Sequence, residues 1–347
     1  VPHERLIRKL KAYGIDGNVV AWIEDWLKNR TQRVVLNGEA SELVEVASGV
    51  PQGSVLGPLL FLIYVNDIDT GLNSAIAKFA DDTKLGGSAV SEEECSTLQR
   101  DLNNIFIWSK TWGMNFNVEK CKVIHIGHNN INFPYTIDNR PLKVVSEEKD
   151  LGVIVSSDLK FHKQCVEQCK KANRILGFIF RHFEYKSKDI ILQLYKSLVR
   201  PHLEYAVQFW SPYLLKDIDM LERVQRRATK MIPGMRSLPY EERLKHLKLP
   251  SLAFRRLRGE LIETFKILKG FDDVRKENLF NLNENNVTRN NGLKLVGKRF
   301  NTNISKNYYT NKVINSWNSL PAEVVAADSI NSFKNRLDKH LKARGFL

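Results

Sequence analysis

The sequence predicts an α+β protein, in which a mixed first part of short strands and helices precedes a helical, basic second part. Up to Val155, short runs of β-branched and aromatic residues alternate with amphipathic runs of helical period. From about His162 onward the helical period dominates. The apolar fraction of 43% is sufficient for packed cores, and 347 residues are enough for two or three domains.

The elements of the first part follow from periodicity and turn signals. Pro2 suits the first turn of a helix and Gly14 its end, and a second helix carries an apolar face up to Leu27. A helix through Leu59 and Tyr64 is apolar nearly all round, so we expect it to be buried. The other predicted elements are strands at 33–36 and 43–47 around Asn37-Gly38, a loop at 48–54, a hairpin at 75–85, a helix at 92–112, and strands at 122–126, 135–137 and 150–155.

The second part is predicted to be helical up to a polar linker. Its helices are expected at 165–181, 187–199, 203–210, 216–231, 240–247 and 251–269. Residues 272–291 are rich in Asn and charge, which is typical of a linker or long loop, and the chain closes with a basic helix. The predicted domains are 1–158, 159–271, a linker at 272–307 and a small unit at 308–347.

Composition bounds the partners and the compartment. The net charge of +14 favours a polyanionic partner, nucleic acid before an anionic membrane surface. No apolar run has the length of a membrane span and no signal peptide opens the chain, so we expect an intracellular protein, nuclear or cytoplasmic, and not a secreted one. His162, Cys165 and Cys169 share a helix face and could hold a metal, although buried structural thiols are the favoured interpretation.

Asp81 and Asp82 are the residues with the clearest chemical potential. Adjacent carboxylates at the bend of a hairpin can be held toward one point, where their oxygens suit Mg²⁺ or Mn²⁺. Two such metal ions can activate a hydroxyl and neutralise a leaving pyrophosphate. The alternative is a turn whose carboxylates accept hydrogen bonds from backbone amides.

The loop before the apolar helix offers a second candidate site. Gly53 and Ser54 are small enough for a nucleotide or template base to approach the backbone, and the Gln52 amide both donates and accepts hydrogen bonds. The beginning of the following helix would also attract phosphate. The alternative is an ordinary loop leading into a core helix.

Taken together, these segments resemble the reverse transcriptases of non-LTR (LINE-type) retrotransposons of the jockey and CR1 kind. The resemblance extends over essentially the whole chain. Gly49–Pro58 (GVPQGSVLGP) resembles motif B, Phe79–Asp82 (FADD) motif C, Trp112–Asn117 with Lys120–Lys122 motif D, Leu151–Val153 the strand that follows, Arg200–Tyr205 and Trp210–Pro212 the thumb, and Trp317–Pro321 the C-terminal tail.

The resemblance implies a fold, an activity and roles for matching positions. The fold would be a partial right hand, with a palm built on a small antiparallel sheet, an all-helical thumb and a small C-terminal unit. The activity would be RNA-directed DNA polymerisation from dNTPs on an RNA template with a DNA primer, with Mg²⁺ or Mn²⁺ held by Asp81 and Asp82. Gln52 and Gly53 would position the nucleotide against the template, and Lys120 would serve the departing pyrophosphate as proton donor or charge partner, with Lys122 close by.

One departure from the family pattern concerns motif A. The chain opens at Val1-Pro2-His3, which resembles the residues just after that motif, so its metal-binding aspartate is expected upstream of Val1. Nothing in the resemblance makes Asp67 or Asp69 a substitute. We therefore expect weak metal binding and no polymerisation by residues 1–347 alone.

Two rival interpretations remain. A non-catalytic nucleic-acid-binding remnant is favoured by the opening of the chain, whereas the intact Asp81-Asp82 pair favours an active parent. A group II intron maturase also has a reverse transcriptase core, but the segments at 203–210 and 317–321 argue against it.

Basic residues at helical spacing are candidate phosphate contacts. Such stripes would add sequence-independent affinity for a template–primer duplex, and the alternative is a solvated helix face. The aromatic residues Phe178, Phe180, Tyr205 and Trp210 are expected in the core, and the alternative is that they are base-stacking platforms. The three basic sets are Arg223, Arg226, Arg227 and Lys230; Lys170, Lys171 and Arg174; and Arg255, Arg256 and Arg258.

Overall fold

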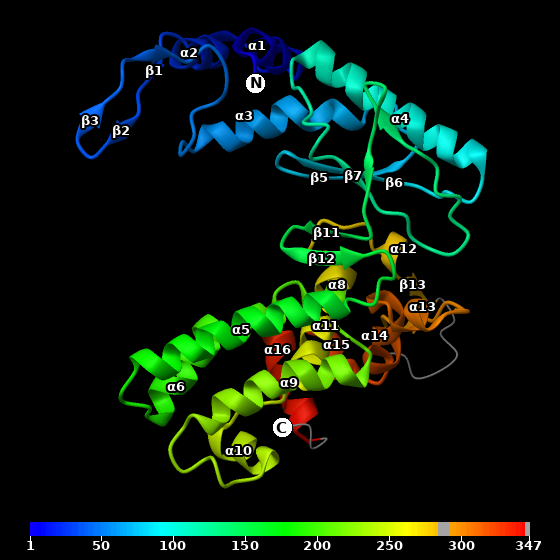
Figure 1. Cartoon of the computed structure of the whole chain (residues 1–347). Coiled ribbons are helices and arrows are strands. Elements are labelled where there is room, and N and C mark those ends of the chain that lie inside the picture. The colour runs from blue at the N-terminus through cyan, green and yellow to red at the C-terminus, as the bar shows by residue number, and fades with distance from the viewer. Residues whose placement is uncertain (284–291, 344–347) are drawn as a thin grey trace. The chain divides into compact units, whose positions relative to one another are not determined.

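The computed structural model describes residues 1–283 and 292–343 and divides into two compact units, Val1–Ser146 and Glu147–Leu347 (Figure 1). Helices combine with small sheets, as the mixed composition predicts. Among the described residues the strands pair only in twos, so the single palm sheet that we expected is not formed there. Within the described residues, no helix is both long enough and apolar enough to cross a bilayer.

The first unit begins with helices and ends with short strands. Its predicted hairpin around Asn37-Gly38 is confirmed, because Leu36 pairs with Glu39. The elements are α1 (His3–Ala12), α2 (Gly17–Leu27), β1 (Thr31–Gln32), β2 (Val35–Leu36), β3 (Glu39–Ala40), β4 (Val44–Glu45), α3 (Leu56–Val65), the 3₁₀ turn η1 (Asn66–Asp69), β5 (Ala75–Phe79), β6 (Asp82–Gly86), α4 (Glu92–Trp112), β7 (Lys122–Val123), β8 (Thr136–Ile137), β9 (Arg140–Pro141) and β10 (Lys143–Val144).

The core of the first unit lies between α1, α2 and α3. Leu6, Leu27 and Leu60 are buried in it, and the Tyr64 side chain is fully enclosed. The expectation that α3 is buried all round is wrong for one face. Leu59 and Leu62 expose about half of their surface (52% and 53%), because no described element of this unit covers that side.

Among its described residues, the second unit is helical apart from two small two-stranded sheets. The predicted helix at 203–210 is two helices, because Ala206 has a φ of 50° and breaks the run. The elements are β11 (Glu147–Asp150), β12 (Val153–Ser156), α5 (His162–His182), α6 (Lys188–Leu194), the π-turn η2 (Tyr195–Val199), α7 (Arg200–Glu204), α8 (Val207–Trp210), α9 (Leu215–Lys230), α10 (Tyr240–Leu247), α11 (Leu252–Lys269), α12 (Lys276–Leu279), β13 (Asn281–Leu282), β14 (Leu295–Val296), α13 (Asn303–Asn307), α14 (Tyr309–Asn318), α15 (Ala322–Val325) and α16 (Ile330–Ala343).

The hairpin β11–β12 replaces the single strand that we expected at 150–155. Leu151 and Gly152 both adopt positive φ (43° and 88°), the geometry of a primed two-residue turn. The Tyr205 hydroxyl donates to the Leu151 carbonyl at 3.0 Å. The Ile154 amide donates to Gln164 of α5 at 2.9 Å. These contacts hold the hairpin to the helices, so the boundary between the units falls at Ser146 and not at residue 158.

The second unit has two apolar clusters that meet at α11. Leu252 at its beginning packs in the cluster of α5 to α10, whereas Phe265 packs with the C-terminal helices, 4.1 Å from Phe333 in a stacked pair. The described part of the predicted unit at 308–347, residues 308–343, therefore packs against α11. The predicted linker at 272–307 adds buried Phe280 and Leu295 to the same cluster, while its middle, 284–291, lies outside the described residues.

A buried polar network around Glu222 joins α9, α10 and α11. Its carboxylate accepts hydrogen bonds from the Leu252 amide at the beginning of α11 (3.0 Å) and from the Tyr240 hydroxyl. Gln225 accepts from Tyr195 at 2.6 Å and donates to the Pro250 carbonyl at 3.0 Å. A carboxylate at the N-terminus of a helix is also favoured by the helix dipole. Glu222 therefore fixes the position of the first turn of α11 against α9.

We predict that Glu222→Ala lowers the free energy of unfolding of the second unit by about 3 kcal/mol, because the Leu252 amide and Tyr240 hydroxyl lose a charged acceptor inside the protein. Urea unfolding followed by fluorescence measures this change. Glu241→Ala, at an exposed position of α10, is the control and should change stability by less than about 0.5 kcal/mol. Equal stability of the two variants would contradict the prediction.

Candidate metal and nucleic-acid sites

The hairpin β5–β6 presents Asp81 and Asp82 at its tip. Phe79 pairs with Asp82, which leaves Ala80 and Asp81 as a two-residue turn. Ala80 has a φ of 51°, a conformation that costs a non-glycine residue about 1 to 2 kcal/mol. Both carboxylates are exposed, and local strain of this kind is common where a chain holds functional groups.

Polar contacts fix both ends of β5, the strand that leads to the aspartates. Near the tip, the Lys78 ammonium donates to Asp69 at 2.9 Å and to the Asn66 carbonyl at 2.8 Å. At the base, the buried Asp101 carboxylate of α4 accepts from the amides of Asn73 (3.0 Å) and Ser74 (2.7 Å). Burial alone would raise the pKa of Asp101, but the hydrogen bonds from Ser74 and Asn73 outweigh it and hold that pKa below its usual value.

A buried lysine ammonium holds η1, the turn that precedes β5. Lys9 of α1 is only 2% exposed and forms an ion pair with Asp67 of η1. Its Nζ lies 4.9, 4.7 and 4.0 Å from the ring centroids of Tyr64, Trp108 and Trp112. Burial lowers the pKa of Lys9, and Asp67 acts against that shift. Asp67 and Asp69 therefore pair with lysines and anchor the hairpin.

The loop at 48–54 is held by its own contacts. The Ser54 hydroxyl donates to the Pro51 carbonyl (2.7 Å) and accepts from the Gly57 amide (2.9 Å), so it is engaged within the loop. A Cβ at Gly57 would lie 2.6 Å from the Pro51 oxygen, so only glycine fits. Gln52 and Gly53 are exposed.

The first residues of the chain run beside this loop. The Gly49 amide donates to the Val1 carbonyl at 2.7 Å, and the His3 imidazole lies 2.8 Å from the Gly49 carbonyl. Pro2 and Ser48 form an isolated β-bridge. The segment that resembles the residues after motif A thus contacts the beginning of motif B.

Lys120 lies in the segment after α4. Its side chain is exposed, and its backbone amide donates to the Asn117 carbonyl at 3.0 Å. Among the described residues, no hydrogen bond or ion pair joins Asp81 or Asp82 to Gln52 or Lys120. The first unit contains all of the predicted catalytic and nucleotide-binding positions, namely Gln52, Gly53, Ser54, Asp81, Asp82 and Lys120.

The carboxylates of Asp81 and Asp82 fit part of a divalent-metal site. Their oxygens are the donors that Mg²⁺ prefers, and both are open to solvent. Among the described residues, no group of three or more His, Cys, Asp or Glu side chains is placed to hold a metal. Two carboxylates would thus need further oxygen ligands from substrate, water or another carboxylate.

The basic row on α9 is partly neutralised. Arg223 and Arg226 share Asp219, at 2.7 and 2.6 Å. Arg227 is exposed and donates to Asn173 of α5 at 3.0 Å, and Lys230 is exposed. Asp219 cancels the charge of one of the two arginines that it contacts. The exposed side chains of Arg223, Arg227 and Lys230 can still contact phosphates.

The expectation that Arg255, Arg256 and Arg258 form a phosphate-binding stripe is wrong. Arg255 pairs with Glu204 through two nitrogens, and Arg258 pairs with Asp338 in the same way, at 2.9 Å for the longer contact. Arg256 is 4% exposed. These guanidinium groups join helices of the second unit because acidic partners distant in sequence face them.

Three of the four aromatic residues that we expected in the core are instead at the surface. Trp210 is fully buried and donates to the Tyr205 carbonyl at 2.7 Å, as expected of a core residue. Phe178, Phe180 and Tyr205 expose more than half of their side chains. Their helical spacing allowed either environment, and only the packing distinguishes them.

His162, Cys165 and Cys169 lie in an environment that suits a structural role and not a metal site. The His162 Nδ1 contacts Asp217, which is fully buried. Burial raises the pKa of Cys165 to about 12 and that of Cys169 to about 11, with Asp217 adding to both shifts. Neutral thiols in an apolar core are poor metal ligands.

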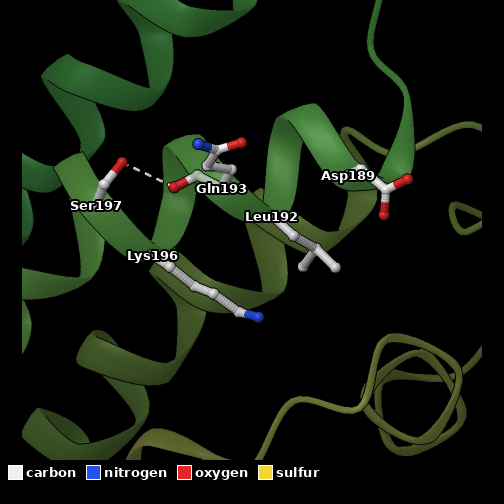
Figure 2. Close-up of a pocket in the computed structure, with 5 residues that line it drawn as sticks. All are labelled: Asp189, Leu192, Gln193, Lys196 and Ser197. Atoms are coloured by element: carbon white, nitrogen blue, oxygen red, sulfur yellow. Dashed lines mark hydrogen bonds between the residues drawn. The ribbon is translucent and has the colours of Figure 1, made fainter.

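A shallow hollow on the second unit does not contain the predicted residues. Its volume is about 440 Å³, and Asp189, Leu192, Gln193, Lys196 and Ser197 line it (Figure 2). These side chains come from one face of α6 and η2, and Ser197 donates to the Gln193 carbonyl at 2.8 Å. Nothing in this hollow matches polymerase chemistry.

Comparison with known proteins assigns the family. The family model described as "Reverse transcriptase (RNA-dependent DNA polymerase)" matches residues 1–180, the stretch that carries the exposed aspartate pair and its anchors. This chain belongs to the reverse transcriptase family.

Curated relatives of this chain come from mobile elements. The chain is 26% identical over 245 residues to "RNA-directed DNA polymerase from mobile element jockey" of Drosophila melanogaster, covering 65% of this chain and 27% of the relative. The jockey polymerase of Drosophila funebris is 28% identical over 67% of the chain and 27% of its own length. The type-1 retrotransposable element R2 polyprotein of Popillia japonica is 28% identical over 45% of the chain and 29% of its own length. The chain thus spans less than a third of each of these relatives.

Sequence reasoning missed the residues that anchor the hairpin. Lys9 follows Leu6 by three residues and therefore lies on the apolar face of α1, which could have indicated a buried ammonium. For Lys78, Asp69 and Asp101 no local signal exists, because their partners come from other elements.

We predict that Asp101→Asn lowers the free energy of unfolding of the first unit by about 1 to 2 kcal/mol at pH 7, because a neutral amide accepts the Asn73 and Ser74 hydrogen bonds more weakly. The pKa of Asp101 is lower in the folded than in the unfolded chain. Its contribution is therefore complete above the unfolded pKa of about 3.9 and is lost as the pH falls through the folded pKa.

Urea unfolding at pH 7, 5 and 3 tests this, with Asp138→Asn at an exposed turn as the control. The difference between the two variants should be constant from pH 7 to 5 and should shrink toward pH 3. A difference that grows on acidification would contradict the assignment.

Proposed function

We propose that this chain supplies the motif B to motif D region and the thumb of an RNA-directed DNA polymerase from a non-LTR retrotransposon. The observation that carries the proposal is the exposed Asp81-Asp82 pair on a hairpin anchored by Lys78 and Asp101, within residues that match the reverse transcriptase family. The first unit would form part of the palm, and α5 to α11 would form the thumb.

In this proposal each site residue has one task. Asp81 and Asp82 would hold Mg²⁺ or Mn²⁺, which when bound supplies activation of the primer hydroxyl and charge neutralisation at the phosphates by a two-metal mechanism. Gln52 and Gly53 would position the incoming dNTP against the RNA template. Lys120, which is exposed, would neutralise or protonate the departing pyrophosphate.

We further propose that residues 1–347 alone polymerise poorly. The described residues offer two carboxylates at the tip and no group of three potential metal ligands. The segment Val1–His3 lies against Gly49, so a residue joined to Val1 would lie beside motif B. A third carboxylate contributed there would complete the metal site.

We predict that primer extension on poly(rA)/oligo(dT) with Mg²⁺ is at least about a thousandfold faster when the chain is extended upstream through motif A of its parent element, because a metal ligand is worth about 4 kcal/mol or more. Asp81→Ala in the extended chain should abolish extension. Glu39→Ala, on an exposed strand, should leave it unchanged. Full activity of residues 1–347 would refute the need for a third carboxylate.

A non-catalytic nucleic-acid-binding role is the second candidate function. The exposed cations Arg223, Arg227 and Lys230 on α9 favour it, since they can contact phosphates without any chemistry at the hairpin. If both residues 1–347 and the upstream-extended chain bind the duplex but neither extends the primer, the non-catalytic binding role is favoured.

We predict that replacing Arg223, Arg227 and Lys230 by Ala weakens binding to an RNA–DNA duplex and reduces the slope of log K against log salt by about 2 to 3, which is about 0.9 for each lost phosphate contact. Fluorescence anisotropy between 50 and 300 mM NaCl provides both values.

The matched control replaces Lys245, Lys269 and Lys339, which are exposed on other helices of the same unit. Both variants lose three positive charges. An equal change in slope would show that net charge, and not the α9 row, accounts for the binding.

A further inference from the structure

Three exposed aromatic residues lie close together in sequence where α5 ends. Phe178, Phe180 and Tyr185 expose 52%, 55% and 81% of their surfaces. They lie within eight residues, at the C-terminal end of α5 and in the segment that leads to α6 (Figure 1). Single exposed apolar residues are ordinary, but a local group of open rings is typical of a binding surface.

Cations accompany these rings. His182 stacks on Phe178, with centroids 4.0 Å apart and an interplanar angle of 24°, and its Nδ1 lies 2.9 Å from the Phe178 carbonyl. The Lys186 ammonium lies 4.5 Å from the Phe180 centroid. Arg181, which follows Phe180 in the sequence, is exposed as well. We call this end of α5 and the residues that follow it, with Phe178, Phe180, Arg181, His182, Tyr185 and Lys186, the α5 tip. Phe178 and Phe180 are two residues apart in the helix, so they face different sides of it.

The charge of the surrounding segment is strongly positive. Between residues 174 and 188 the chain has four Lys and Arg residues and one acidic residue, Glu184. A surface for an apolar protein or a neutral ligand would not need this excess. A polyanion that also carries flat rings can pair with the positive charges and stack on the exposed aromatic faces.

We infer that the α5 tip binds the unpaired bases of single-stranded nucleic acid. A ring stacks only on a base whose face is free, and the bases of a duplex cover one another. The α9 helix has cations but no aromatic residue of its own, and Tyr240 of α10, which lies under Arg226, is partly buried, so the row suits phosphates alone. The α5 tip is therefore a second contact, for a strand outside the duplex, and goes beyond the proposed polymerase function.

The preformed stack of His182 on Phe178 supports this function. The hydrogen bond to the Phe178 carbonyl restrains the imidazole, so little side-chain entropy remains to be lost when a base adds to the outer ring face. Tyr185 has no ring partner within the described residues and exposes most of its surface, so it can stack on a neighbouring base.

The test compares anisotropy of fluorescein-labelled oligo(rU) with that of a blunt RNA–DNA duplex of equal length, using the whole chain. Phe178→Ala with Tyr185→Ala should weaken oligo(rU) binding about tenfold or more, since stacking is worth about 1 to 3 kcal/mol per base. Duplex affinity should change by less than about twofold.

Trp22→Ala is the matched control. Trp22 exposes 55%, as Phe180 does, but stacks on Trp26 with no cation. It should leave both affinities unchanged. Arg181→Gln with Lys186→Gln should reduce the salt slope for oligo(rU) by about 1.4.

Three results would overturn the inference: unchanged oligo(rU) affinity in the aromatic double variant, an equal loss for oligo(rU) and duplex, or duplex binding by the unaltered chain without oligo(rU) binding. If sedimentation shows that the same variant only abolishes self-association, the tip is an interface between copies. The proposed polymerase function fails separately, through loss of primer extension by the extended chain.

Discussion

The desolvated ammonium of Lys9 is the constraint on which the candidate metal site depends. A buried charge is tolerated only where it is paired, and Asp67 supplies the counter-charge while three aromatic rings surround the ammonium. Asp67 belongs to η1, between α3 and β5, and Trp108 donates to the same carboxylate at 3.0 Å. The ion pair from Lys9 and the hydrogen bond from Trp108 therefore tie α1 and α4 to the point where the motif B helix ends and the motif C hairpin begins.

The second unit uses a buried anion in the same way. Glu222 faces inward on α9 and fixes the beginning of α11, while Arg223 and Arg227 of the same helix face outward. The helical period thus separates residues that hold the unit together from residues available to a polyanion. Arg255 and Arg258 show the opposite case, because Glu204 and Asp338 remove their charges from the surface.

Local sequence patterns were sufficient to predict the elements that form and support the candidate metal site. The hairpin with Asp81 and Asp82 at its tip and the helix at 92–112 were predicted from period and turn residues, and the structure has both. The interval at 150–155 was misassigned, because Leu151 adopts the positive φ that a turn requires and that its side chain disfavours. Phe178 and Phe180 were misassigned because the burial of a ring at the end of a helix depends on which neighbours reach it.

The sequence by itself determined the reverse transcriptase family, the order of helices and short strands, and the excess of positive charge, since these depend on residue types at short spacing. Only the tertiary structure decided which charges remain available. Lys9 and Asp67 are 58 residues apart, Arg255 and Glu204 51, and Arg258 and Asp338 80. Pairs at such separations arise from the packing of whole helices, which no local pattern specifies, and they leave the Asp81-Asp82 tip, part of the α9 row and the α5 tip as surfaces open to a ligand.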